Sequence, residues 1–398
     1  MSEESKQPAP KRVLSGMRPT GKLHLGNYMG ALKNWVELQN ATHADGSPKY
    51  ECYFFIADYH ALTTDYADTS GLKENVREVA LDFLAAGLDP RCCTIFVQSE
   101  VPAHAELALL LGMITPLSWL ERVPSYKDQQ EQLKEKDLAT FGFLGYPLLM
   151  SADILVYQAD FVPVGQDQAA HVEITREIAR RFNFIYGTKG SHSVTPFNYL
   201  VETRGLELAQ ELRPKGVSLV SRTISQKDMA AASSPEEIEN TNEILPEPKV
   251  LLTPSPKLPG TDGRKMSKSY GNTILLSDPE LEVRAKLKTM VTDPARIRRT
   301  DKGNPDVCPV FDLHKVFSTD EKQTEVRMGC TSAGIGCIQC KGWLADAVVK
   351  ELAPIQQRRQ HFEAHPEEVA KILDQGAVRA NARAEQTMQQ VRAAVRLG

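Results

Sequence analysis

The chain has 398 residues, which is more than one ordinary domain needs, so we expect two compact units with one core each. Its formal net charge of -4 excludes a strongly basic protein, so a nucleic-acid partner would have to bind a local basic surface. Residues 1–10 are polar and contain prolines, which predicts a disordered tail and no signal peptide. The most apolar stretch, 107–120, contains Pro116 and is too short to span a bilayer. We therefore expect neither secretion nor membrane insertion.

A loop containing glycine follows the first predicted strand, Val13-Leu14. Pro19 and three glycines exclude regular structure up to Asn27, where an amphipathic helix begins. Free amides at a helix start attract phosphate, and Gly26 has no side chain to keep a phosphate away. His24 offers a hydrogen-bond donor at the same place. The loop therefore predicts a nucleotide site, although most glycine-containing turns of this kind bind nothing.

Strands and helices then alternate. We expect strands at 53–57, 94–97 and 161–164, and helices at 72–86, within 104–138, at 146–158 and from Gly165 to Phe182, the last capped by Asp167. This alternation predicts an α/β fold with a Rossmann-like, doubly wound parallel sheet. Asp153 lies in the apolar helix 146–158 and needs a partner, because an unpaired buried carboxylate is costly.

The alternation of strands and helices stops in residues 188–249, which we interpret as a surface insertion. The chain becomes helical after Ser277-Asp278-Pro279. We expect a catalytic domain at 11–277 and a helical domain at 278–398. The last helix, 378–395, is a candidate to pack back on the catalytic domain.

A second loop, Pro259 to Ser269, contains the run Lys265-Met266-Ser267-Lys268-Ser269. Together with the first loop it resembles the two signatures of class I aminoacyl-tRNA synthetases. Asn27 stands where many of these enzymes have a second histidine, which keeps a hydrogen-bonding side chain at that position.

Further segments resemble the tryptophanyl-tRNA synthetase family: 56–62, 97–104, 150–155 and 162–168. The tyrosyl enzymes are the nearest alternative, but they have a glutamine at the position of Met150. A thioether against an indole ring and a carboxylate accepting from its N–H would suit tryptophan, which assigns these roles to Met150 and Asp153. Tyr146 and Gln168 resemble the ligands for the substrate ammonium, and His60 is a pocket candidate.

The resemblance implies activation of L-tryptophan by ATP with magnesium, followed by transfer to tRNA(Trp). Catalysis would be positioning and charge stabilisation, by His24, Lys265 and Lys268. The expected ATP-binding residues are Arg18, Thr20, His24, Gly26, Asn27, Gly165, Asp167, Lys265, Met266, Ser267 and Lys268. A non-catalytic RNA-binding paralogue of the same fold is the alternative from another class. The resemblance further implies a helical domain that binds the tRNA anticodon.

Four of the seven cysteines lie between residues 308 and 340, which indicates a metal-type site in a reduced, cytoplasmic protein: Cys308, Cys330, Cys337 and Cys340. Zinc and a [4Fe-4S] cluster both accept four thiolates. The pattern resembles that of bacterial tryptophanyl enzymes with a [4Fe-4S] cluster, which implies the cluster and keeps zinc as the alternative. The cluster would fix the fold around Lys341, where the anticodon would dock.

A basic group nearby, Arg296, Arg298, Arg299 and Lys302, fits tRNA contact and plain solubility about equally. The resemblance also implies a homodimer, with 107–120 as a candidate interface, and no DNA partner.

Overall fold

The computed structural model describes residues 9–123, 139–165, 169–187, 243–252 and 257–397. These residues form two compact units. Unit 1 comprises the described parts of 1–101, 163–169 and 250–380, and unit 2 those of 102–162, 170–249 and 381–398. Strands β4 and β5 and the last helix each contribute residues to both units. The functional boundary expected at residue 277 stays a prediction.

Five strands form one sheet in the order β3-β2-β1-β4-β5. Their bounds are β1 Lys11–Met17, β2 Tyr50–Ile56, β3 Cys93–Val97, β4 Phe161–Val164 and β5 Lys249–Leu252. Strand β1 pairs in parallel with β2, and β2 with β3. Because β1 lies inside the sheet and successive connections leave it in both directions, the doubly wound α/β prediction is confirmed.

Helices of unit 1 cover the first strands. The bounds are α1 Leu25–Asn27, a π-helical segment Tyr28–Leu32, α2 Lys33–Gln39, α3 Asp58–Asp65 and α4 Leu72–Ala86. Trp35 of α2 stacks on Phe54 of β2 at 4.8 Å between ring centroids. Gly87 ends α4 with a φ of +113°, a conformation that favours glycine. The predicted bounds of α4 and β4 are confirmed residue for residue.

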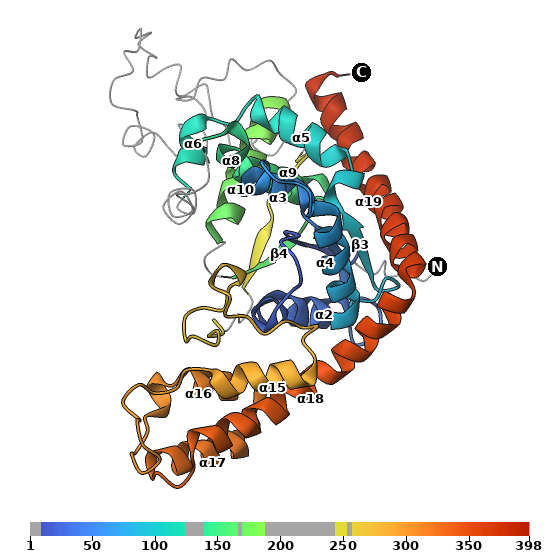
Figure 1. The fold of residues 1–398 in the computed structure, drawn as a ribbon. Helices are drawn as coiled ribbons and strands as arrows, with labels where there is room; N and C mark the ends of the chain where they lie inside the picture. The colour runs from blue at the N-terminus through green and yellow to red at the C-terminus, as the bar shows by residue number, and fades with distance from the viewer. Residues whose placement is uncertain (1–8, 124–138, 166–168, 188–242, 253–256, 398) are drawn as a thin grey trace, which may run out of the picture. The chain divides into compact units, whose positions relative to one another are not determined.

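A helical region follows the second loop in unit 1. It contains α15 Glu280–Thr289, α16 Pro309–Phe317, α17 Asp320–Thr331 and α18 Cys337–Ala364. Figure 1 shows α16 and α17 at the end remote from the sheet, while α18 runs from there to pack against α4. The predicted C-terminal helical region is confirmed. The last helix, α19, spans Pro366–Val395.

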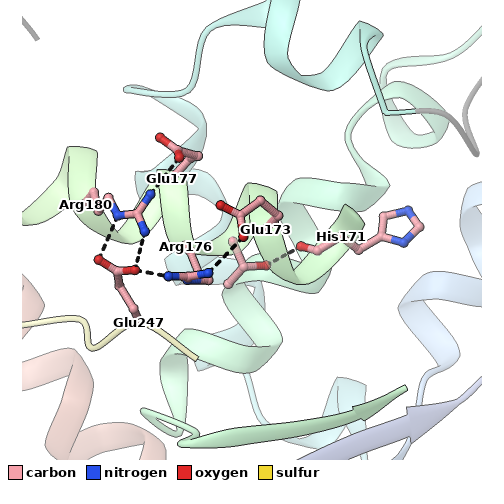
Figure 2. A network of polar contacts seen from close by, with 7 residues as sticks. His171, Glu173, Arg176, Glu177, Arg180 and Glu247 are labelled. Atoms are coloured by element: carbon pink, nitrogen blue, oxygen red, sulfur yellow. Dashed lines mark hydrogen bonds and ion pairs between the residues drawn. The ribbon is translucent and has the colours of Figure 1, made fainter. Parts of the chain in front are cut away.

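Unit 2 is mainly helical, with α5 Ala103–Gly112, α6 Leu117–Glu121, α8 Phe141–Leu144, α9 Tyr146–Val156 and α10 Ala169–Tyr186. The expected break at Pro116 separates α5 from α6. Figure 2 shows Arg176 and Arg180 of α10 converging on Glu247, which lies near the start of β5. The Arg180 fork donates to both Glu247 oxygens at 2.7 and 2.6 Å. Such a bidentate pair fixes the chain entering β5 against α10.

Residues 243–249, the end of the segment expected to be a surface insertion, instead contact α10 of unit 2. Leu245 is fully buried, and the Asn183 carboxamide oxygen accepts the N–H groups of Ile244 and Leu245 at 3.0 Å each. The sequence pattern missed β5 because its four residues, one lysine and three apolar residues, show no alternation between polar and apolar side chains. The remainder of the expected insertion, 188–242, lies outside the described residues.

Candidate functional site

The first glycine-containing loop ends in a reciprocal cap at α1. The His24 Nδ1 atom accepts the Asn27 N–H at 3.3 Å, and the Asn27 Oδ1 atom accepts the His24 N–H at 3.1 Å. Because Nδ1 accepts, the proton of a neutral imidazole lies on Nε2, which can donate to a ligand. Burial first, and then the charges of Lys268 and Lys265, lower the pKa of His24 to about 4. His24 is therefore a neutral donor at physiological pH.

Gly26 is required by this cap. A Cβ atom at Gly26 would lie 2.9 Å from two atoms of the His24 ring. The residue pattern alone indicated that Gly26 lets a phosphate approach the backbone. The packing adds a second reason, because any side chain here would displace the imidazole.

The second loop is organised by Asn272, which is almost fully buried. Its Oδ1 atom accepts the Ser267 N–H at 2.8 Å, and its amide donates to Asp262 at 2.7 Å and to the Lys265 carbonyl at 3.2 Å. A Cβ atom at Gly260 would meet Asn272 at 2.3 Å. Asn272 thus holds the backbone on both sides of Met266, whose side chain is buried.

The two loops are hydrogen-bonded to each other. Leu25 donates its N–H to the Ile274 carbonyl, and Leu276 donates to the Leu23 carbonyl, both at 2.9 Å. Across the same junction, the Lys268 Nζ atom donates to the Gly21 carbonyl at 2.7 Å and lies 3.4 Å from the Thr20 hydroxyl. Burial lowers the pKa of Lys268 to about 8, against the opposing charge of Asp82. The structure therefore brings His24, Thr20 and Lys268 together from segments far apart in the sequence.

The remaining ATP candidates of unit 1 are less enclosed. Lys265 is exposed, and the Ser267 hydroxyl lies 2.9 Å from the Ser269 hydroxyl. The Arg18 guanidinium bonds the Thr64 hydroxyl and lies 3.3 Å from Asp65. It is therefore anchored to the end of α3. Gly165 directly follows β4, and Asp167 lies outside the described residues.

A buried polar triad occupies unit 2. Asp153 of α9 is 1% exposed, and its Oδ1 atom lies 2.6 Å from the His104 Nδ1 atom of α5. The other ring nitrogen of His104 lies 2.9 Å from the Tyr157 hydroxyl. The expectation that Asp153 has a partner is confirmed. His104 ends the segment 97–104, which carries part of the family resemblance, but no local sequence pattern marks it as the partner of Asp153.

The other amino-acid candidates belong to different units or lie outside the described residues. In unit 2, the Tyr146 hydroxyl lies 2.9 Å from the His171 Nε2 atom, and Met150, one helical turn along α9, is half-buried. His60 belongs to α3 of unit 1, where its N–H donates to Gln98 at 3.4 Å. Gln168 is not among the described residues.

Three helix ends in unit 1 carry the four predicted metal ligands. Cys308 precedes α16, Cys330 lies in the last turn of α17, and Cys337 and Cys340 lie in the first turn of α18. Burial, followed by the charges of the other three thiols, raises the pKa of Cys340 to about 12. Within the described ranges, however, no group of three or more His, Cys, Asp or Glu side chains is arranged to hold a metal ion.

Arg296 corrects the basic group proposed from the sequence. It is buried and donates to the Ile335 carbonyl at 2.6 Å and to the Arg299 carbonyl at 3.2 Å. Its other amino group approaches the Cys330 thiol at 3.6 Å. Arg296 is therefore a structural residue, whereas Arg298, Arg299 and Lys302 are exposed.

The family model for class I tRNA synthetases for tryptophan and tyrosine matches residues 6–206 and 223–353. The tryptophan–tRNA ligase of Ralstonia nicotianae is 48% identical over 98% of this chain and 99% of its own length. That of Thermotoga maritima is 45% identical over 97% and 99%. The solved tryptophanyl-tRNA synthetase of Campylobacter jejuni, complexed with ADP and tryptophan, aligns with a TM-score of 0.72 at 30% identity, over 97% of this chain and all of that chain.

The chain therefore belongs to the class I tRNA synthetases of the tryptophan and tyrosine type. Its activity is that of a tryptophan–tRNA ligase, which uses ATP to join tryptophan to tRNA(Trp). In the described part of the chain, every helix is too short or too polar to cross a bilayer.

Proposed function

We propose that the paired loops around His24 and Lys268 carry out the activation step of this ligase. In that step the tryptophan carboxylate attacks the α-phosphate of ATP, a new phosphorus–oxygen bond forms, and pyrophosphate leaves with the electron pair of the broken bond. No protein nucleophile is needed. The observation that carries the proposal is the pairing of the loops, Leu25 to Ile274 and Leu276 to Leu23, which holds a neutral imidazole and a half-buried ammonium at one junction.

Each group has a role that follows from its charge. The His24 Nε2–H would donate to a phosphate oxygen without adding a full charge, together with free amides at the start of α1. Lys268 and the exposed Lys265 would neutralise the negative charge that develops as pyrophosphate separates. Arg18, Thr20, Gly26, Asn27, Gly165, Asp167, Met266 and Ser267 would complete the nucleotide site.

Magnesium would accompany the nucleotide. The assigned side chains that the structure describes are cations and neutral donors, which suit phosphate oxygens, and Asp167 is the single carboxylate among the nucleotide candidates. Magnesium would then be held chiefly by phosphate oxygens and water, where it supplies charge neutralisation.

We assign tryptophan selection in unit 2 to α9. Asp153 would accept the indole N–H, because its carboxylate is buried in unit 2 and His104 fixes its orientation. Met150 would lie against the ring, and Tyr146 would help bind the substrate ammonium, with Gln168 and His60 as further candidates. Selection of tyrosine would need, at position 150, a side chain that hydrogen-bonds the phenol hydroxyl of the substrate. The thioether of Met150 is a poor partner for that hydroxyl.

The four cysteines are proposed to hold a [4Fe-4S] cluster, with zinc as the alternative. All four cysteines are free thiols, and Cys308, Cys330 and Cys337 each contribute to the electrostatic environment of Cys340. Burial first, and then the neighbouring thiols, raise the pKa of Cys340, so metal binding would release a proton and the metal charge would offset the repulsion among the thiolates that form. The metal group would link the ends of α16, α17 and α18. It would take no part in adenylation.

Three proposals concern partners and place in the cell. The exposed Arg298, Arg299 and Lys302, with Lys341, would contact the tRNA backbone near the anticodon. The homodimer would form through α5 and α6, where Leu109, Met113 and Leu117 are 61 to 72% exposed. An activity on tRNA is consistent with a cytoplasmic protein, and so are cysteines that remain free thiols.

The decisive experiment is tryptophan-dependent exchange of label between pyrophosphate and ATP, run in parallel with the other nineteen amino acids. We expect exchange with tryptophan and little with tyrosine. Exchange with tyrosine at a comparable rate would overturn the assignment of Met150 and Asp153. No exchange with any amino acid would favour the non-catalytic paralogue.

A further inference from the structure

A fully buried carboxylate in α4 is shared between the first nucleotide loop and the helical region. The Asp82 Oδ2 atom accepts the Leu23 N–H at 2.7 Å, and its Oδ1 atom is bonded by the Arg359 guanidinium of α18. Leu23 directly precedes His24. One oxygen of Asp82 is therefore committed to the loop and the other to a helix that begins at Cys337.

Arg359 is itself held from several sides. Its side chain is 3% exposed and forms ion pairs with Asp82 and Glu78 of α4 and with Glu363 of α18. Glu78 is 14% exposed and Glu363 is 45% exposed. A charge that is buried among fixed partners cannot relax into water when one of them is removed, so the geometry of this cluster is tightly determined.

The cluster acts directly on the backbone that presents His24. Asp82 binds the N–H of Leu23, and the N–H of Leu276 binds its carbonyl at 2.9 Å. Both peptide groups of Leu23 are thereby fixed between α4 and the segment that follows the second loop. Burial lowers the pKa of Lys268, and the negative charge of Asp82 partly opposes that shift by favouring the charged ammonium.

Helix α18 also contacts residues close to the two loops at two further points. The Gln356 amide donates to the Asp278 carbonyl at 2.8 Å, just after the second loop. The Tyr28 hydroxyl, in the helix that begins at the first loop, lies 3.1 Å from Glu351. The helix therefore contacts the surroundings of both loops.

We propose that Asp82 and Arg359 are positioning residues for ATP, through which α18 sets the position of the first nucleotide loop. Neither touches the substrates. The inference rests on the proposed role of the His24 loop and adds a physical link from residues 351–359 of α18 to that loop. Loss of the pair would release Leu23 and the cap of α1, and with it the donor that faces the phosphates.

The test compares two single variants, their double variant and a control by pyrophosphate exchange and by direct ATP binding. Arg359→Met keeps the length of the side chain and removes its charge. Asp82→Asn has a single acceptor oxygen, so it cannot serve both Leu23 and Arg359. Each should raise the KM and the Kd for ATP about tenfold, the effect of losing a charge-assisted hydrogen bond, and leave the KM for tryptophan within about twofold.

Glu363→Gln is the matched control. It removes a carboxylate from the same arginine while Asp82 and Glu78 stay in place, so ATP binding should stay within about twofold of the original. The double variant Asp82→Asn/Arg359→Met should be no worse than the more affected single variant, because both changes break one link.

Two results would overturn the inference. One is a lower Tm in both variants with an unchanged KM for ATP, and the other is an equal rise in KM for ATP and tryptophan. If Arg359→Met fails to fold, Arg359→Lys tests the same link, because a single ammonium cannot reproduce the fork to Asp82 and Glu78. Exchange by the unaltered protein tests the proposed function separately, so the two failures are distinguishable.

Discussion

His24 and Asn27 cap each other across the first turn of α1, each accepting the backbone N–H of the other. The arrangement gives Asn27, the departure from the family signature, a defined task. It satisfies the His24 N–H and is fixed itself, while the imidazole keeps Nε2 for the ligand. The substitution therefore leaves the capping function of the loop intact.

The pH dependence of ATP use should follow Lys268 and not His24. The His24 pKa of about 4 keeps the imidazole neutral from pH 6 upward. The Lys268 pKa of about 8 means that the free enzyme loses this charge as the pH rises through 8, so kcat/KM for ATP should fall there. Lys268→Arg should remove that alkaline fall, because a guanidinium stays charged.

The measurement is kcat/KM for ATP in pyrophosphate exchange from about pH 6 to 9.5. An acidic fall centred near 6.5, absent in His24→Gln, would contradict the neutral-donor role of His24.

Gly26→Ala should impair activation by displacing the imidazole. The new Cβ would lie 2.9 Å from the ring, so the cap must shift. We expect the adenylation rate to fall about tenfold or more, with unchanged circular dichroism. Gly342→Ala is the control, because its Cβ would meet no atom within 4 Å. That variant should keep full activity and gain up to about 1 kcal/mol of stability from helix propensity.

His104→Phe should lower the free energy of unfolding by about 3 kcal/mol, because Asp153 would lose the charge-assisted partner that it has inside unit 2. The KM for tryptophan should rise as well, since the carboxylate is no longer oriented. Urea unfolding and exchange kinetics measure the two effects. His43→Ala, at an exposed position, should change neither. A stable His104→Phe protein with an unchanged KM would remove His104 from any role in the site.

The regular elements were predictable where local pattern decides structure. Helix α4 carries its apolar face at helical spacing and ends at a glycine, so its bounds could be read directly. Strand β5 has only four residues and was missed, because such a strand is defined by its neighbour and not by its own pattern.

Within the site, the residues of the two loops could be named from their run of residue types, since glycines, lysines and a histidine have a local meaning. The roles of Asp82, Asn272 and His104 could not be predicted in this way. A polar residue inside a helix or beside a glycine does not indicate, from its sequence neighbours, which residue it contacts. Their roles depend on contacts with segments distant in the sequence, which only the folded chain defines.

Met113→Glu should separate the proposed homodimer. Met113 is 72% exposed at the end of α5, beside a buried face formed by Leu107 and Leu111, so a charge there would leave the packing of unit 2 intact and oppose apolar association. Light scattering should report a dimer for the original protein and a monomer for the variant. Leu281→Glu, at another highly exposed apolar residue, should remain dimeric. A monomeric original protein would remove the proposal.

Cys337→Ser should reduce tRNA charging while tryptophan-dependent exchange stays within about twofold, because the cysteines lie in the helical region and outside the nucleotide loops. Anaerobically purified protein should be brown, with iron and acid-labile sulfide in about equal amounts. Cys92→Ser, at an exposed cysteine elsewhere, should leave both properties unchanged. Colourless protein with stoichiometric zinc would exclude the [4Fe-4S] cluster and would leave the four cysteines assigned as zinc ligands.

The pairing of Leu23 and Leu25 with Leu276 and Ile274 has a consequence for biosynthesis. The ribosome releases the first loop long before it reaches the second, so the growing chain carries an unfinished phosphate site through most of its translation. Closing the junction requires contact between segments of very large sequence separation, which is slow to form. The proposed nucleotide site is therefore completed late and in one step, and a nascent chain that stalls before residue 274 is expected to be unable to consume ATP.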